Sequence, residues 1–312
     1  MPKVSVIIPI YNVEKYIEKC ARSLFEQTLD DIEYLFINDC TPDESIEVLE
    51  AVLEEYPYRK DQVIIHSMEE NKGQAAVREW GMQNAKGDYI IHCDSDDWVD
   101  RDTYRLMYGK AIDEGADIVV CDFIISDGKN NVRRGKGAGA VDKTSFINRL
   151  LFQQDVWALW NKLVRRDICN KNIVFPIHNM GEDMALVFQY VINSKTIAYE
   201  PMALYYYRNN PTSIIHAASE EKLMNNFYQN IGNAEIVVDI FERCGITHQF
   251  NRGLVNIKWQ IKKQLWKTRF DRKKFNIWKA TYPEINWSLF FVKEIKLTDK
   301  IKFLLTQFTL YP

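Results

Sequence analysis

The sequence lacks several features that define other classes of protein. Its 312 residues contain no CxxC pair and no uninterrupted apolar run that approaches the roughly 18 residues of a membrane span. Six cysteines are scattered along the chain, which predicts reduced and mostly buried thiols in a cytoplasmic protein. We expect no signal peptide, because Met1 to Lys3 lead directly into a strand pattern. No internal repeat and no nucleic-acid-binding motif is present.

The composition is that of an ordinary globular protein, with 46% hydrophobic and 27% charged residues, and the length suits one large or two modest domains. The formal net charge of -3 hides an uneven distribution. Residues 251–312 carry 14 Lys+Arg against 4 Asp+Glu, a net of +10, which leaves 26 - 39 = -13 for residues 1–250. The last fifth of the chain is therefore a basic appendage.

Strand and helix patterns alternate through the first 90 or so residues. Apolar runs predict strands at 3–9 (ended by Pro9), 32–37, 63–66 and 89–93, and amphipathic patterns predict helices at 13–27, 42–55 and 74–85. This alternation predicts an α/β protein with a doubly wound, mostly parallel sheet flanked by helices. Further along we expect a strand at 117–123, a loop or hairpin at 126–140, and helices at 104–114, 143–152, 181–193 and 220–243.

An acidic cluster follows the fourth predicted strand, with Asp94, Ser95, Asp96 and Asp97 at its carboxyl end. Open α/β sheets bind ligands at this edge, and carboxylates suit Mg²⁺ or Mn²⁺, which most often hold phosphates. The alternative is an N-cap with an acidic first turn for the helix that follows.

Four linked motifs carry a family resemblance. VSVIIPIYN (4–12), INDCTPD (37–43), ENKG (70–73) and GDYIIHCDSDD (87–97) resemble the nucleotide-sugar domain of the family 2 (GT-A fold) inverting glycosyltransferases, in that family's order. The resemblance continues more thinly through WNKL (160–163), GED (181–183) and YYYRNNPTSI (205–214). It implies a GT-A (Rossmann-like) domain with a nucleotide-binding half at 1–123 and an acceptor-binding half at 124–217. A helical, basic-aromatic extension would occupy 218–312.

The resemblance implies a set of nucleotide-binding residues. Asp39 matches the acid that accepts the imide N–H of uracil, although it could instead cap a turn before Pro42. Arg78 matches a residue that steadies the diphosphate, although it could be an ordinary ion-pair partner. The remaining implied nucleotide contacts are Pro9, Tyr11, Asn12, Asn71, Gly73, Asp94 and Ser95.

The resemblance also implies the catalytic groups. Asp94 and Asp96 match the DxD pair that holds Mn²⁺ or Mg²⁺, and Asp97 could share that role. Asp183 matches the general base that deprotonates the acceptor, with Glu182 orienting it or binding the acceptor. The alternative for both is an acidic first turn of the helix that follows.

Acceptor binding would fall to Trp160, Asn161, Lys162 and Arg208, although a large aromatic is more often a core residue than a sugar platform. Arg208 and Ser213 could also close over the diphosphate, where His178 and His216 could join them, although a single histidine is more often structural.

The basic tail has two interpretations. Its lysines and arginines at 258, 262, 263, 267, 269 and 272–274 are interleaved with Trp259, Trp266 and Phe270. This pattern suits an interfacial helix on an anionic membrane, or a solvated helical pair whose aromatic residues pack on the catalytic domain.

Together these features predict a metal-dependent, inverting hexosyl- or N-acetylhexosaminyltransferase. It would use a UDP-sugar donor and a saccharide acceptor, lipid-linked in our prediction, during bacterial surface polysaccharide synthesis. We expect it in the cytoplasm or on the inner face of the cell membrane. The alternatives are a sugar-nucleotide or glycan binding protein without catalysis, and a nucleotidyltransferase. The latter is disfavoured because no Gly-rich, basic first loop is present to cradle a triphosphate.

Overall fold

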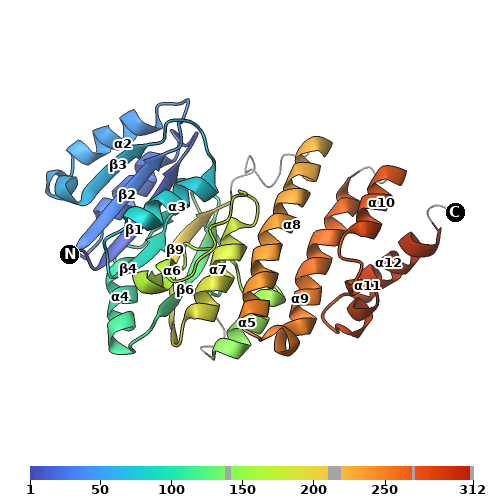
Figure 1. Cartoon of the computed structure of the whole chain (residues 1–312). Helices are drawn as coiled ribbons and strands as arrows, with labels where there is room; N and C mark the ends of the chain where they lie inside the picture. The colour runs from blue at the N-terminus through green and yellow to red at the C-terminus, as the bar shows by residue number, and fades with distance from the viewer. Residues whose placement is uncertain (138–141, 210–218, 269–270, 310–312) are drawn as a thin grey trace.

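The computed structural model describes residues 1–137, 142–209, 219–268 and 271–309. A sheet flanked by helices forms one end of the molecule, and a row of helices continues from it to the other end (Figure 1). This arrangement confirms the predicted α/β fold with a helical C-terminal extension. None of the described helices is long and apolar enough to span a bilayer.

The strands are β1 (Val4–Ile10), β2 (Ile32–Asn38), β3 (Val63–Ser67), β4 (Tyr89–His92), β5 (Trp98–Val99), β6 (Ile118–Ser126), β7 (Asn131–Gly135), β8 (Lys162–Arg165) and β9 (Ile197–Arg208). The first helices are α1 (Ile17–Phe25), α2 (Ser45–Glu54), η1 (Pro57–Gln62), α3 (Gln74–Asn84), α4 (Thr103–Asp113), α5 (Lys143–Leu151), α6 (Arg166–Asn170) and α7 (Glu182–Asn193). The extension contains α8 (Glu220–Arg243), α9 (Thr247–Lys262), η3 (Lys263–Lys267), α10 (Arg272–Ala280), α11 (Ile285–Ser288), η4 (Leu289–Phe291) and α12 (Leu297–Thr309).

The sheet combines a parallel half and a mixed half. Its order is β3-β2-β1-β4-β8-β6-β9-β5, with β7 paired to β6. Strands β3, β2, β1 and β4 are parallel, whereas β8 runs antiparallel to both of its neighbours. The carboxyl ends of the four parallel strands therefore lie along one edge, as the sequence predicted. The predicted domain boundary after residue 123 falls inside β6, so both halves share one sheet.

Pro9 lies inside β1 rather than ending it, which corrects the sequence-based expectation. Pro9 is paired with Ile37 of β2, whereas the pairing of β1 with β4 ends at Ile7 and His92. In a strand, alternate residues direct their N–H groups to the same side, so the missing N–H of Pro9 points to the side that β4 has already left. The proline removes no ladder hydrogen bond there.

Two hydrophobic cores lie on opposite faces of the sheet. One packs α1, α2 and α4 against alternate β1 residues such as Val6 and Ile8. The other packs α3, α5 and α7 against residues such as Ile7 and continues without a break through α8 and α9 to α12. Alternation along β1 places successive apolar side chains in different cores, which is why the sequence shows one continuous apolar run.

The sequence periodicity did not predict three of the strands. The short strands β5 and β8 and the long strand β9 carry polar or aromatic residues that did not form a distinct strand pattern. Helix α1 begins at Ile17 rather than at residue 13, because Asn12 adopts a left-handed φ of 57° and a turn precedes the helix. The region after 126 contains the expected hairpin, formed by β6 and β7.

Candidate functional site

The loops after β1 and β2 are fastened to each other by short polar side chains. The backbone N–H of Asn12 donates to Thr41 Oγ1 (2.7 Å), and that of Val13 donates to Ser45 Oγ (3.1 Å). Asp43 accepts hydrogen bonds from the Thr41 and Ser45 hydroxyls. These bonds hold two loops at the ligand-binding edge of the sheet and leave Tyr11 exposed between them.

Asp39 is buried beside these loops, where it holds the loop after β3. Its two carboxylate oxygens accept the backbone N–H groups of Lys72 (2.7 Å) and Gly73 (2.8 Å). Each oxygen has a second lone pair, so Asp39 can still accept another donor. The predicted nucleotide role and this structural role are therefore compatible.

Gly73 and Asn179 form a contact that the sequence did not reveal. Gly73 has a φ of +83°, and a Cβ there would lie 2.1 Å from Asn179 Nδ2. Asn179 Oδ1 accepts the backbone N–H of Ala75 (3.0 Å) in the first turn of α3. Only glycine permits this close approach, which brings the residue 179 segment, just before α7, against the nucleotide half.

Arg78 joins the two acidic motifs of the sequence. Its guanidinium, on α3, donates to Asp94 Oδ1 (2.9 Å) and forms an ion pair with Glu182 Oε1 (3.2 Å). Its side chain is only 4% exposed. Burial disfavours the cation, but Asp94 and Glu182 outweigh that effect and raise the Arg78 pKa. Acids separated by 88 positions are thus brought to one buried cation.

Asp94 and Asp96 present carboxylates suited to a divalent metal. The Asp96 carboxylate accepts no hydrogen bond from another residue in the described part of the chain, and Asp94 Oδ2 is left over after Oδ1 bonds Arg78. Burial, together with the Asp94 charge, raises the pKa of Asp96 to about 6. No cluster of three metal-ligating side chains occurs in the described parts of the chain. The donor set fits Mg²⁺ or Mn²⁺ held by two acids and completed by a phosphate ligand.

The Asp97 carboxylate holds the end of β9 through hydrogen bonds to both of its oxygens. Its carboxylate accepts the Tyr205 hydroxyl (2.7 Å) and the Arg208 backbone N–H (2.6 Å), and its side chain is buried. Burial and the neighbouring acids Asp96 and Asp94 raise its pKa well above the usual range. Tyr205 also accepts the Asp94 backbone N–H (3.1 Å). Tyr205, which belongs to the 205–214 motif but had no predicted role, thus fixes both ends of the acidic turn.

Arg208 lies directly beside this turn. Its Nε donates to the Asp96 carbonyl (2.8 Å), and its guanidinium lies over the rings of Tyr16 (4.8 Å) and Trp98 (5.1 Å). This position is next to the predicted metal site, where a cation can meet a diphosphate. Ser213 and His216 lie outside the described residues.

Glu182 and Asp183 occupy the first turn of α7, as the sequence predicted. Gly181 precedes them with a left-handed φ of 83°, and the positive end of the helix dipole favours both carboxylates. Burial raises the pKa of Glu182 to about 8, although Arg78 opposes the shift, and burial also raises the pKa of Asp183. Asp183 remains partly exposed, whereas Glu182 is buried.

A residue of the extension fixes this turn from the other side. Asn233 of α8 is fully buried, and its Nδ2 donates to the carbonyls of His178 (2.8 Å) and Met180 (2.9 Å). The backbone N–H of Met180 donates to Gln229 Oε1 (3.0 Å). These contacts make α8 part of the support of the acidic pair, a role that no sequence pattern indicated. His178 packs against Gly232 of the same helix.

The predicted acceptor residues 160–162 are mostly enclosed. Trp160 is 7% exposed and stacks on Tyr205 with ring centroids 4.3 Å apart. Asn161 is buried and bonds the Cys121 carbonyl, and the Lys162 ammonium donates to Val156 O, Ala158 O and Asn161 Oδ1. Burial lowers the Lys162 pKa to about 8. These contacts support the sheet beneath the acidic turn, and the acceptor-binding role of the three residues stays a prediction.

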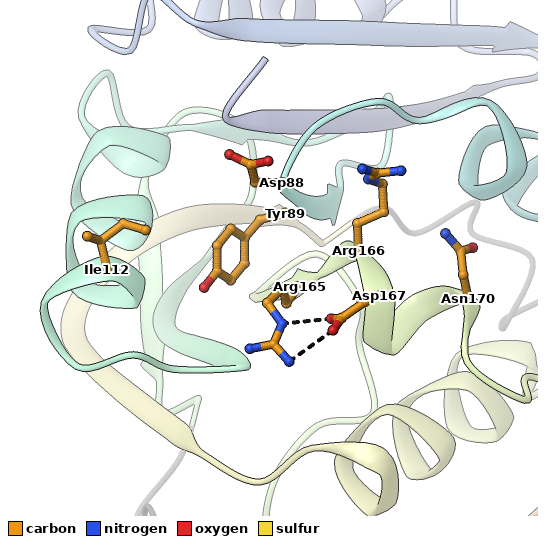
Figure 2. Close-up of a pocket in the computed structure, with 7 residues that line it drawn as sticks. All are labelled: Asp88, Tyr89, Ile112, Arg165, Arg166, Asp167 and Asn170. Carbon is orange, nitrogen blue, oxygen red and sulfur yellow. Dashed lines mark hydrogen bonds and ion pairs between the residues drawn. The ribbon is translucent and has the colours of Figure 1, made fainter. Parts of the chain in front are cut away.

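A cavity of about 480 Å³ lies elsewhere (Figure 2). It is bordered by Asp88 and Tyr89 at the start of β4, and by Arg165, whose Nε donates to Asp167 (2.7 Å). This is the edge of the sheet opposite to Asp94, so the cavity is not the predicted nucleotide site. Asn12, Asn71 and Ser95 lie on loops at the Asp94 edge, and Pro9 lies in the last two residues of β1 at the same edge.

The family model described as "Glycosyl transferase family 2" matches residues 5–194, which include every acidic group described above. The chain belongs to glycosyl transferase family 2. The match ends before β9 and the extension, so Arg208 and α8 lie beyond it. The enzyme class predicted from the motifs is thereby confirmed.

Several relatives carry related names. The chain is 31% identical to the uncharacterized glycosyltransferase EpsJ of Bacillus subtilis over 74% of this chain and 69% of EpsJ. It is 30% identical to the glycosyltransferase GlyA of Streptococcus pneumoniae over 70% of this chain. It is 25% identical to the minor teichoic acid biosynthesis protein GgaB of B. subtilis over 87% of this chain. The chain spans only about a third of GlyA (32%) and of GgaB (31%).

Solved structures confirm the fold of this family 2 glycosyltransferase. S. aureus TarS 1–349 in complex with UDP-GlcNAc matches with a TM-score of 0.60 at 18% identity, over 84% of this chain and 81% of that one. The mannosyltransferase PcManGT of Pyrobaculum calidifontis, in complex with GDP-Man and Mn²⁺, matches with a TM-score of 0.57 at 13% identity, over 98% and 86% of the two chains. Both structures contain a sugar nucleotide, UDP-GlcNAc in one and GDP-Man in the other.

Proposed function

We propose that this family 2 enzyme is an inverting, metal-dependent transferase that moves a hexose or N-acetylhexosamine from a UDP-sugar to a saccharide acceptor. The observation that carries the proposal is the Arg78 bridge. It joins Asp94 of the predicted donor site to Glu182, the neighbour of the predicted base Asp183, on one buried guanidinium. A donor phosphate and an acceptor hydroxyl bound at these groups would therefore be close together.

The reaction follows from this arrangement. The Asp183 carboxylate takes the proton of the acceptor hydroxyl, and the acceptor oxygen forms a bond to the anomeric carbon. The bond from that carbon to the β-phosphate oxygen breaks on the opposite face, and UDP leaves. Glu182, held by Arg78, would keep the first turn of α7 in place.

Asp94 and Asp96 would hold Mn²⁺ or Mg²⁺, which supplies charge neutralisation for the departing diphosphate. The Mn²⁺ in the PcManGT structure supports a divalent ion in this fold. Arg208, stacked between Tyr16 and Trp98, would add a fixed positive charge near the same diphosphate. Asp39 would accept the uracil imide through its remaining lone pairs, and the UDP-GlcNAc in the TarS structure supports a uridine donor.

The acceptor would be a growing cell-surface polysaccharide. Support comes from GgaB, named for minor teichoic acid biosynthesis, and from a 28% identical poly(ribitol-phosphate) beta-glucosyltransferase of Bacillus spizizenii. Such acceptors are assembled on lipid carriers in our proposal, which would place the enzyme on the inner face of the membrane.

The deciding experiment measures UDP release from a panel of UDP-hexoses and UDP-N-acetylhexosamines, with Mn²⁺, with Mg²⁺ and with chelator. Metal-dependent release from one donor is expected. Asp96→Ala should lower that release on the order of 100-fold, because the leaving group loses its metal. The matched variant Asp113→Asn, at the exposed end of α4, should leave it unchanged.

Calorimetric titration with UDP separates the remaining alternatives. A binding protein without catalysis would bind UDP and give no release with any donor or with a mixed polysaccharide acceptor. Equal UDP affinity with and without metal would contradict the assignment of Asp94 and Asp96.

A further inference from the structure

The outer face of the last helix is apolar, although the inner face of the same helix is already packed. Helix α12 buries Phe303 and Thr306 against the extension, yet Leu297 (70%), Ile301 (49%) and Leu305 (53%) are exposed. These three residues are spaced four apart and form one row along the side opposite to the buried residues. Because α12 is apolar on its exposed side as well as on its buried side, we expect a further surface to cover the exposed side.

The row continues onto the preceding segment. Trp287 of α11 is 73% exposed and Phe291 of η4 is 80% exposed. A groove of about 220 Å³ lies between Trp287 and the α12 residues Phe303, Leu304 and Gln307. We define the apolar face as Trp287, Phe291, Leu297, Ile301 and Leu305. In Figure 1 its helices α11 and α12 lie at the end of the molecule far from β1–β3.

Unneutralised lysines border the apolar face. Lys300 and Lys302 lie on either side of the row along α12, and Lys293 and Lys296 precede it. None of the four forms an ion pair with a described residue, although Lys300 donates to the Phe290 carbonyl (3.0 Å) and Lys302 lies over the Trp266 ring (4.4 Å). The nearby acids are already engaged: Glu294 pairs with Arg252 (3.1 Å) and Asp299 with Lys263 (3.2 Å). The charge presented around the face is therefore positive.

We propose that the apolar face is a docking surface for an anionic lipid bilayer, with Trp287, Phe291 and the α12 row inserted at the interface and the four lysines among the headgroups. Leucine, tryptophan and phenylalanine flanked by lysine are the residues that interfacial helices use. A second copy of the chain fits less well, because a symmetric contact would bring eight lysines together.

This inference rests on the membrane location in the proposed function and assigns that contact to a surface, which differs from the membrane segment suggested by sequence alone. Trp259 and Lys262 of that segment are fully buried, and Trp266 packs against Trp259 with ring centroids 5.2 Å apart. These residues pack inside the extension rather than on the catalytic domain, which was the predicted alternative: Trp259 lies against Phe303 of α12 (ring centroids 5.8 Å apart) and Lys262 against the Trp278 ring. The residues of the apolar face begin at Trp287, which is 21 positions after Trp266.

The test is sedimentation of the full chain with two kinds of vesicle. One contains phosphatidylcholine alone, and the other also contains phosphatidylglycerol as about one lipid in three, which makes its surface strongly anionic. Binding is expected only to the anionic vesicles and should weaken with salt. Leu297→Ser with Ile301→Ser should lower the apparent affinity by about tenfold or more, and Lys293→Glu with Lys296→Glu by a similar factor. Ile112→Ser with Val132→Ser, two exposed apolar residues of the sheet half, is the matched control and should bind normally.

Equal binding to both vesicle types, or unchanged binding of the Leu297/Ile301 variant, would overturn the proposal. So would light scattering that shows a dimer lost in that variant, because the face would then join two copies. UDP release without vesicles is measured on every variant. Normal release with lost sedimentation supports the docking surface, whereas failure of release in the unaltered chain bears only on the proposed function.

Discussion

Two buried cations show how differently the halves of this molecule use charge. Arg78, in the sheet half, is surrounded by the acids Asp94 and Glu182, which raise its pKa. Lys262, in the extension, is held by the neutral Thr281 carbonyl (2.7 Å) and Asn286 Oδ1 (2.8 Å), with the Trp278 ring 4.7 Å away. Burial lowers the Lys262 pKa to about 8.

The difference concerns what each cation organises. Arg78 gathers acids that repel one another, so its charge is needed for the arrangement itself. Lys262 organises only backbone and amide oxygens, and a neutral side chain of similar size could take its place. The sheet half therefore depends on charge for its chemistry, and the extension depends on packing for its stability. The predictions below test this contrast.

The largest effect is expected for Asp183→Asn. Loss of the general base should lower kcat by about 1,000-fold while UDP affinity changes little. Asp299→Asn, which removes a paired acid from the extension, is the matched control and should retain kcat. Turnover of Asp183→Asn within a few-fold of the unaltered enzyme would exclude Asp183 as the base.

Replacement of the two cations by methionine compares the halves directly. Arg78→Met leaves buried Glu182 and partly buried Asp94 without a partner and should destabilise the fold by about 3 kcal/mol. Lys262→Met removes hydrogen bonds to neutral oxygens and should cost about 1 kcal/mol. Urea unfolding at pH 7 measures both. Similar losses for the two variants would show that the acids do not depend on Arg78.

Asn233→Ala tests whether the extension contributes to the chemistry as well as to stability. Asn233 belongs to α8 of the extension, yet it supports the turn before Glu182. We expect kcat to fall about tenfold with little change in UDP affinity, since a small displacement of the base slows transfer. Asn226→Ala, on the same helix, is the control. A drop in UDP affinity that equals the drop in kcat would indicate general distortion instead.

The smallest effect is a pH dependence of stability. The Lys262 pKa falls from 10.5 to about 8 on folding, so between these values the unfolded chain binds a proton that the folded chain has released. Stability relative to Lys262→Met should therefore rise with pH across this interval, on the order of 1 kcal/mol. Urea titrations at pH 7.5 and 9.5 measure the change. A pH-independent difference would mean that Lys262 stays protonated.

Local sequence determined the parallel half. The apolar runs that became β1 to β4, the glycine before α3 and the acids at the end of β4 are each encoded within a few consecutive residues. Their pattern follows from strand alternation and helix periodicity, which act over short distances. The acidic first turn of α7 was predictable for the same reason.

Only the tertiary structure decided which of these residues meet. Arg78 reaches Glu182 across 104 positions, and Asn233 reaches the turn before α7 from a helix whose own pattern shows only amphipathicity. Burial likewise separated Trp259 and Lys262, which pack inside, from Leu297 and Ile301, which face outward. All four are residue types that interfacial membrane helices use. Which of them can touch lipid depends on the contacts that fold the extension onto itself, because those contacts cover one set of side chains and leave the other at the surface.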